Sequence, residues 1–114
     1  MDWIGLITKY LDLFLIRCFD QVSSETPQQY LASHYDPISG RMDESLVRSA
    51  MPQTRRAIVK ARQAAPRAER RNFPRYGRDE IYTITETRLI EAMNASESEV
   101  AAVKSVAATM GDDD

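Results

Sequence analysis

The stretch "MDWIGLITKYLDLFLIRCFD", residues 1–20, has the spacing of an amphipathic helix. Its aromatic and aliphatic side chains recur every three or four residues, which places them on one side of a helix. Lys9, Asp12 and Arg17 interrupt the run, so the stretch lacks the roughly 20 apolar residues that a transmembrane helix needs. We therefore expect residues 1–20 to form a helix whose apolar face packs against protein or lies in a membrane interface.

The apolar side of this helix is a candidate docking surface for a partner protein or an anionic membrane. Its members are Trp3, Ile7, Tyr10, Leu11, Phe14 and Cys18. Cys18 is the single cysteine of the chain, which excludes an internal disulfide and fits a reducing, intracellular compartment, cytoplasmic or nuclear. A cysteine on an apolar helix face is usually buried, whereas in the membrane alternative Cys18 would serve as an acylation site.

Capping residues and prolines divide the middle of the chain into short helices. Thr26 as cap and Pro27 at the first helical position predict a helix from about 27 to 34, followed by the turn "DPISG". Asp43 can cap a helix that Pro52 is expected to interrupt. A second run, from residue 54 to 65, then stops before the next proline.

Two further helices are predicted towards the C-terminus. The segment 79–83 is compatible with a short strand or a helix, and the capping box "TITE" favours a helix over about 84–93. The box "SESE" opens a helix that begins after Ser96 and ends at Gly111. The fold class is therefore all-α, a single small domain of four to six short helices with an irregular basic loop and an acidic C-terminal end.

Composition and charge support one folded domain with a divided surface. Hydrophobic residues make up 43% and charged residues 28% of the 114 residues, as in an ordinary globular protein. The amphipathic helix 1–20 is followed, after an acidic stretch, by a basic helix and loop over 54–78, an acidic helical region over 79–111 and a tail over 112–114. Between residues 55 and 78 nine cations face one acid, a net charge of +8, while the net charge of the whole chain is only −2.

Motifs for catalysis and metal binding do not occur in the sequence. There is no P-loop, no G-x-G-x-x-G and no metal-ligand spacing, and His34, the single histidine, has no cysteine near it and no G-x-S-x-G elbow to serve. We expect no enzymatic activity, no cofactor, no metal and no small-molecule substrate.

The basic segment, residues 55–78, is the candidate nucleic-acid interface. Arginine outnumbers lysine there by eight to one, and guanidinium groups suit phosphate contacts and stacking. Phe73 and Tyr76 are suited to stacking on unpaired bases, which favours RNA or single strands. The predicted contact residues are Arg55, Arg56, Lys60, Arg62, Arg67, Arg70, Arg71, Phe73, Arg75, Tyr76 and Arg78.

Three alternatives remain for the basic segment. Its arginines can pair with the acids of residues 79–114, within one chain or between copies, or they can bind an anionic membrane together with the N-terminal helix. Residues 43–65 also have the outline of a helix-turn-helix, although the linker around Pro52 lacks a glycine.

The overall plan places a hydrophobic helix first, an arginine-rich centre next and an acidic end last. This plan is similar in outline to small nucleocapsid and accessory proteins of viruses, and the resemblance implies RNA binding. A homo-oligomer is also expected because the apolar faces of the first and last helices exceed what so small a core needs.

Overall fold

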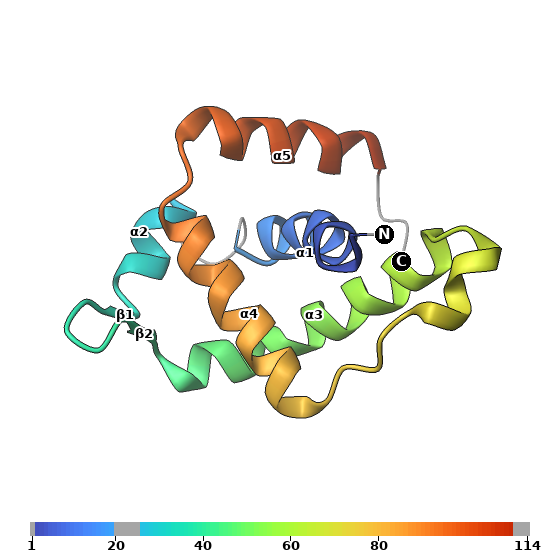
Figure 1. Ribbon diagram of the computed structural model, residues 1–114. Helices are drawn as coiled ribbons and strands as arrows, with labels where there is room; N and C mark the ends of the chain where they lie inside the picture. Colours follow the sequence, from blue (N-terminus) through green and yellow to red (C-terminus); the bar gives the residue numbers. More distant parts are fainter. Residues whose placement is uncertain (1, 20–25, 111–114) are drawn as a thin grey trace.

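The computed structural model describes residues 2–19 and 26–110, and this part of the chain is almost entirely helical (Figure 1). Its elements in order are α1 (Trp3–Phe19), α2 (Pro27–Ala32), β1 (Tyr35–Asp36), β2 (Arg41–Met42), α3 (Glu44–Ala64), the 3₁₀-helix η1 (Arg67–Asn72), α4 (Arg78–Met93) and α5 (Glu97–Met110). The predicted all-α class and its four to six helices are confirmed.

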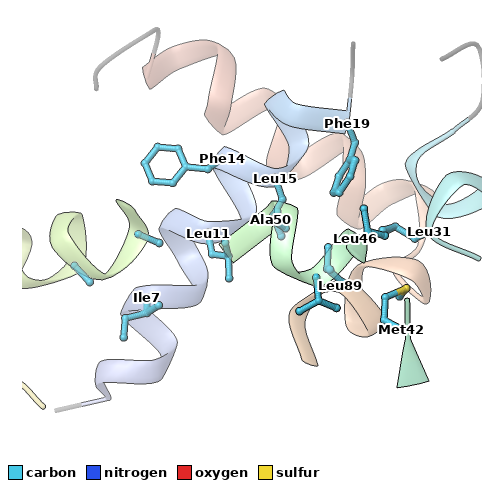
Figure 2. Packing of buried hydrophobic residues seen from close by; sticks show 13 residues of the cluster. Ile7, Leu11, Phe14, Leu15, Phe19, Leu31, Met42, Leu46, Ala50 and Leu89 are labelled. Atoms are coloured by element: carbon cyan, nitrogen blue, oxygen red, sulfur yellow. The ribbon is translucent and has the colours of Figure 1, made fainter. Parts of the chain in front are cut away.

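Helix α1 lies in the centre of the molecule, with α5 on one side and α3 and α4 on the other (Figure 1). Its side chains Ile7 and Leu11 are completely buried, as are Val47 of α3 and Leu89 of α4. Figure 2 shows Ile7, Leu11 and Leu89 in one cluster with Leu31 of α2, and Val47 belongs to the same cluster. The apolar face of the N-terminal helix is thus the middle layer of the chain's own core.

Small side chains on α3 allow the neighbouring helices to approach closely. Ala50, Ala57 and Ala61 are buried in the core. Thr54 on the same helix and Thr85 on α4 are fully buried, and their hydroxyl oxygens lie 2.6 Å apart. Thr85 also donates to the carbonyl of Ile81 at 2.6 Å, so the proton between the two threonines comes from Thr54. The hydrogen bond between the two buried threonines is therefore directional.

Pro52 does not interrupt the helix around it, contrary to the prediction. Residues 44–64 form one continuous helix with Pro52 exposed inside it. A proline in a helix interior costs about 3 kcal/mol because it removes a backbone hydrogen bond and crowds the preceding turn. The buried side chains on either side of it, Met51 and Thr54, belong to the same face, and their packing offsets that cost. The helix-turn-helix alternative is excluded by this continuity.

Helix α4 begins earlier than the sequence predicts. It starts at Arg78, with Gly77 as its N-cap, so residues 79–83 are helical and the strand alternative is wrong. The Glu80 carboxylate accepts a hydrogen bond from the Gly77 N–H at 3.2 Å, and Ile81 and Thr85 are buried. The capping box at Thr83 therefore lies inside the helix, where the Thr83 hydroxyl donates to the carbonyl of Asp79.

Two predicted helix starts are confirmed, whereas α2 ends at Ala32 and not at about residue 34. Thr26 caps α2 by accepting from the N–H of Gln29, and Ser96 accepts from the N–H of Glu99 at the start of α5. The turn after α2 closes a two-stranded antiparallel hairpin, β1 with β2, in which Gly40 adopts φ +71°. A left-handed residue is needed there, and glycine adopts it without strain. The C-terminal tail, 112–114, and Gly111 lie outside the described residues.

The hairpin and α5 are held to the body by different contacts. Glu86 of α4 accepts from the Arg41 Nε at 2.9 Å and from the Met42 N–H at 3.1 Å, which fixes the hairpin. Helix α5 rests on α1 through the half-buried Val100, Val103 and Ala107. None of the helices within residues 2–19 and 26–110 combines the length and apolar composition needed to cross a bilayer.

Candidate nucleic-acid interface

The second half of α3 carries cations on both of its flanks. Arg55 and Arg62 are seven residues apart and share one flank, with the exposed Val59 between them. Arg56 and Lys60 are four residues apart and share the other flank, which faces α1. The buried stripe of α3 runs between the two flanks on the inner side, so the helix separates its cations into two rows.

On the flank that faces α1, some of the cationic side chains pack against other residues of the chain. The Arg56 guanidinium lies 4.3 Å from the centre of the Phe14 ring, a cation–π contact, and it donates to the Gln53 side chain at 2.9 Å. Figure 2 shows Phe14 on the opposite side of α1 from Leu15. Lys60 and Arg17 line a hollow of about 250 Å³ between α1 and α3.

Arg70 has a structural task that the sequence does not reveal. Its Nη2 donates to the carbonyl of Gln63 at 2.9 Å, and its Nε donates to the carbonyl of Ala65 at 3.2 Å. These carbonyls belong to the last turn of α3, whose oxygens have no partner within the helix. Arg70 therefore caps α3 and holds η1 against its end, whereas the equally exposed Arg67 and Arg71 form no such hydrogen bond within the described residues.

The segment after η1 runs back beside α3 (Figure 1). Side chains of this segment and of α3 enclose a hollow of about 370 Å³. We call this the arginine–aromatic hollow; its lining residues are Ile58, Val59, Arg62, Gln63, Phe73, Pro74, Arg75 and Tyr76. Four of the predicted contact residues, two arginines and both aromatics, thus come together in one place. Arg78 is exposed at the first position of α4.

The aromatic wall of the hollow is anchored to the N-terminal helix. The ring centroids of Phe73 and Trp3 are 4.8 Å apart in an edge arrangement, and those of Phe73 and Tyr76 are 6.2 Å apart. Burial raises the pKa of the Tyr76 phenol, and the negative charge of Glu80 raises it further. Tyr76 therefore stays uncharged at neutral pH, without an anionic oxygen that would repel phosphate.

The acidic C-terminal region does not neutralise most of the basic segment. Two of its carboxylates bind arginines that lie outside the basic segment: Glu86 binds Arg41, and Glu91 binds Arg88. Among the residues that the structure describes, eight of the nine cations form no ion pair with a carboxylate: Arg55, Lys60, Arg62, Arg67, Arg70, Arg71, Arg75 and Arg78. Within one chain, these eight cations are therefore not neutralised by carboxylates of residues 2–19 and 26–110.

The predicted docking residues of the N-terminal helix are mostly inside the molecule. Ile7, Leu11 and Phe14 are buried in the core, and Trp3 and Tyr10 are half-buried against it. Cys18 is exposed, contrary to the expectation that it is buried. A partner or membrane could reach the three buried side chains only if α1 left the core.

Three residues of the hollow, Ile58, Val59 and Gln63, did not figure in the sequence prediction. The sequence could have indicated Val59, because helical spacing places this apolar residue between Arg55 and Arg62 on the helix surface, where it is 54% exposed. Nothing in the sequence indicates Gln63, because an exposed glutamine on a helix is ordinary.

The described ranges contain no cluster of metal-ligating side chains. No three side chains of the His, Cys, Asp or Glu type are grouped there so as to hold a metal ion. The half-buried His34 contacts the Asp43 carboxylate at 3.3 Å and stacks beside Tyr30, an arrangement that joins α2 to the start of α3.

Comparisons of the chain with protein-family models, curated proteins and solved structures found no match. The function is accordingly argued from the charges, contacts and shape of the interface itself.

Proposed function

We propose that this protein binds nucleic acid without catalysing a reaction, with RNA or a single strand as the preferred ligand. Binding uses the phosphate backbone, through the exposed cations of α3, η1 and the segment that follows. A place among small nucleocapsid or accessory proteins, an intracellular location and self-association belong to the same proposal. These three properties agree with a protein that has a large cationic surface.

The observation that carries the proposal is that the cations are available. Seven of them, Arg55, Lys60, Arg62, Arg67, Arg71, Arg75 and Arg78, have neither a carboxylate partner among the described residues nor a hydrogen bond to the backbone. Holding such charges close together costs electrostatic free energy, which a polyanion relieves on binding. Each phosphate contact also releases condensed counterions.

The adaptor alternative gives α1 the task of seating in a partner or an anionic membrane. It requires Ile7, Leu11 and Phe14 to leave the core, which would expose the centre of the molecule. The buried position of these residues favours nucleic acid over docking through α1.

A salt series tests the proposal. Labelled single-stranded RNA is titrated with the protein between low and physiological salt, and log K is plotted against log salt concentration. About five phosphate contacts give a slope near −3.5, because each single-strand contact contributes about −0.7. The triple variant Arg62→Gln/Arg71→Gln/Arg75→Gln is expected to reduce the magnitude of that slope by about two units.

Arg48→Gln is the matched control, since Arg48 is an exposed arginine on α3 outside the basic segment and pairs with Glu44. It should leave the slope within about half a unit of the original. An affinity that does not change with salt, or that survives the triple variant, contradicts the proposal.

A further inference from the structure

We infer that the arginine–aromatic hollow receives one unpaired nucleobase of the bound strand, so that the site distinguishes single strands from duplexes. The inference rests on the proposed function and adds a specific place and a ligand class to it. A general cationic surface would bind both forms of nucleic acid according to charge density alone.

The shape and lining of the hollow suit a flat aromatic group. Its volume of about 370 Å³ falls within the range of roughly 300–1,000 Å³ typical of small-ligand sites. Apolar side chains from α3, Ile58 and Val59, form one wall, and Phe73 and Tyr76 from the following segment form the other. A base between such walls gains stacking and loses contact with water.

The charges of the hollow suit the sugar–phosphate on either side of that base. Arg62 lies on the helix wall and Arg75 on the opposite, extended segment. Neither has a carboxylate partner in the part of the chain that the structure describes. Two cations on opposite walls can contact the phosphates before and after one nucleotide, which holds its base over the opening.

Gln63 supplies a hydrogen-bonding group beside the apolar walls. Its main-chain carbonyl accepts from Arg70, which fixes the backbone at this point. Gln63 lines the hollow, and its side-chain amide makes no hydrogen bond within residues 2–19 and 26–110. An amide both donates and accepts, so it can pair with the edge of an inserted base.

A base inside a duplex cannot enter this hollow. Its two faces are covered by neighbouring base pairs, and extracting it costs a few kcal/mol of unstacking and unpairing. A base in a single strand has open faces, and stacking it on aromatic side chains contributes about 1–3 kcal/mol. The hollow should therefore raise the affinity for strands with accessible bases to about 5- to 150-fold above the affinity for a sugar–phosphate backbone that lacks bases.

The chain contains its own reporter for this site. Trp3 is the single tryptophan, and its ring lies 4.8 Å from Phe73 in the wall of the hollow. A base that stacks within the hollow is expected to change the emission of Trp3. Phosphate contacts elsewhere on the basic segment should not.

The experiment uses three ligands of equal length at one salt concentration: oligouridine, an abasic oligomer with the same sugar–phosphate backbone, and a duplex RNA. Oligouridine should bind at least fivefold more tightly than the abasic oligomer and should alone change Trp3 emission. Anionic and neutral vesicles are the fourth and fifth probes, because arginines also bind lipid phosphate.

Substitutions at two positions locate the effect. Val59→Trp fills the hollow from an exposed position without touching the core or the arginines, so it should abolish the preference for oligouridine and preserve the salt slope. Tyr76→Ala should lower the affinity for oligouridine towards that of the abasic oligomer, whereas Tyr76→Phe, which keeps the ring, should retain it.

The outcomes separate this inference from the proposal on which it rests. Equal, salt-dependent binding of the oligouridine and the abasic oligomer, with unchanged Trp3 emission, overturns the base site and leaves nucleic-acid binding intact. No salt-dependent binding of any oligomer overturns both. Binding to anionic vesicles alone replaces both with a membrane function.

Discussion

Asp12 and Arg88, separated by 76 positions in the chain, form a two-pronged ion pair. The Nε and Nη2 of Arg88 donate to the two carboxylate oxygens of Asp12, each at 2.6 Å. The pair joins α1 to α4, and the two side chains are only 26% and 22% exposed for arginine and aspartate respectively. The hydrogen bonds that Arg88 donates to the Asp12 carboxylate raise the pKa of Arg88 above its ordinary value, although burial opposes this.

Replacing Arg88 with methionine should destabilise the protein by about 1–3 kcal/mol, between the values for exposed and buried pairs. The loss arises because Asp12 keeps its partial burial but loses both donors. Urea unfolding at pH 7 measures the change. Arg48→Met, which removes the exposed pair with Glu44, should cost no more than about 0.5 kcal/mol; equal losses in the two variants would contradict this prediction.

Replacing Thr54 and replacing Thr85 should lower the free energy of unfolding by different amounts. Thr85→Val removes the acceptor for Thr54 and leaves a buried hydroxyl donor without a partner, which should cost about 1–3 kcal/mol. Thr54→Val removes only the donor, because Thr85 still donates to Ile81, and should cost about 1 kcal/mol. A double-mutant cycle measured by thermal unfolding checks the order. A larger loss for Thr54→Val would reverse the assigned direction of the hydrogen bond.

Arg70 and Arg71 are neighbours in sequence with different expected roles. Arg71→Ala should weaken RNA binding and reduce the magnitude of the salt slope by about 0.7, because an exposed cation is lost. Arg70→Ala should mainly lower stability, by about 1 kcal/mol, since two carbonyls at the end of α3 lose their donor. Unfolding curves and RNA titrations on both variants separate the roles. If the two variants behave alike in both assays, Arg70 is not a cap.

Acid should loosen the hairpin through Asp36. The N–H of Ile38 and the hydroxyl of Ser39 donate to its carboxylate at 2.9 Å, and these bonds lower the pKa of Asp36 below its usual value of 3.8. Because the folded pKa is the lower one, the stabilising effect is present above pH 3.8 and is lost as pH falls through the folded pKa.

An NMR titration of the Asp36 carboxyl carbon measures its midpoint, with the Ile38 amide as a second probe. Both should titrate together below pH 3.8. Ser39→Ala removes one donor and should move the midpoint upward. A midpoint at or above 3.8 in the unmodified protein would contradict the prediction.

The sequence predicts helices well where capping and periodicity agree, and less well where a tertiary contact decides. Thr26 and Ser96 mark the starts of α2 and α5 because the donors they accept from are three residues away. Pro52 misleads because the packing that keeps α3 continuous comes from α1 and α4, far away in sequence. The start of α4 is obscured because Gly77 caps it without a side chain.

The sequence alone identifies the basic segment, but it does not show that the cations of this segment have different roles. Charge density identifies the nine cations without showing that Arg70 bonds to α3 or that Arg56 covers Phe14. The expectation of an oligomer rested on unused apolar faces of the first and last helices. Those faces lie on one another within the chain, so that reason no longer applies, and self-association stays a proposal.

The way α5 is attached gives the protein a graded resistance to unfolding. None of the described side chains of α5 is buried, and the helix follows α4 after a break of only three residues, 94–96. Elements with little buried apolar surface open at a lower free energy than the core. Backbone amides of α5 should thus exchange with deuterium before those of α1 and α3, and the molecule would consist of a cooperative core with a detachable outer layer.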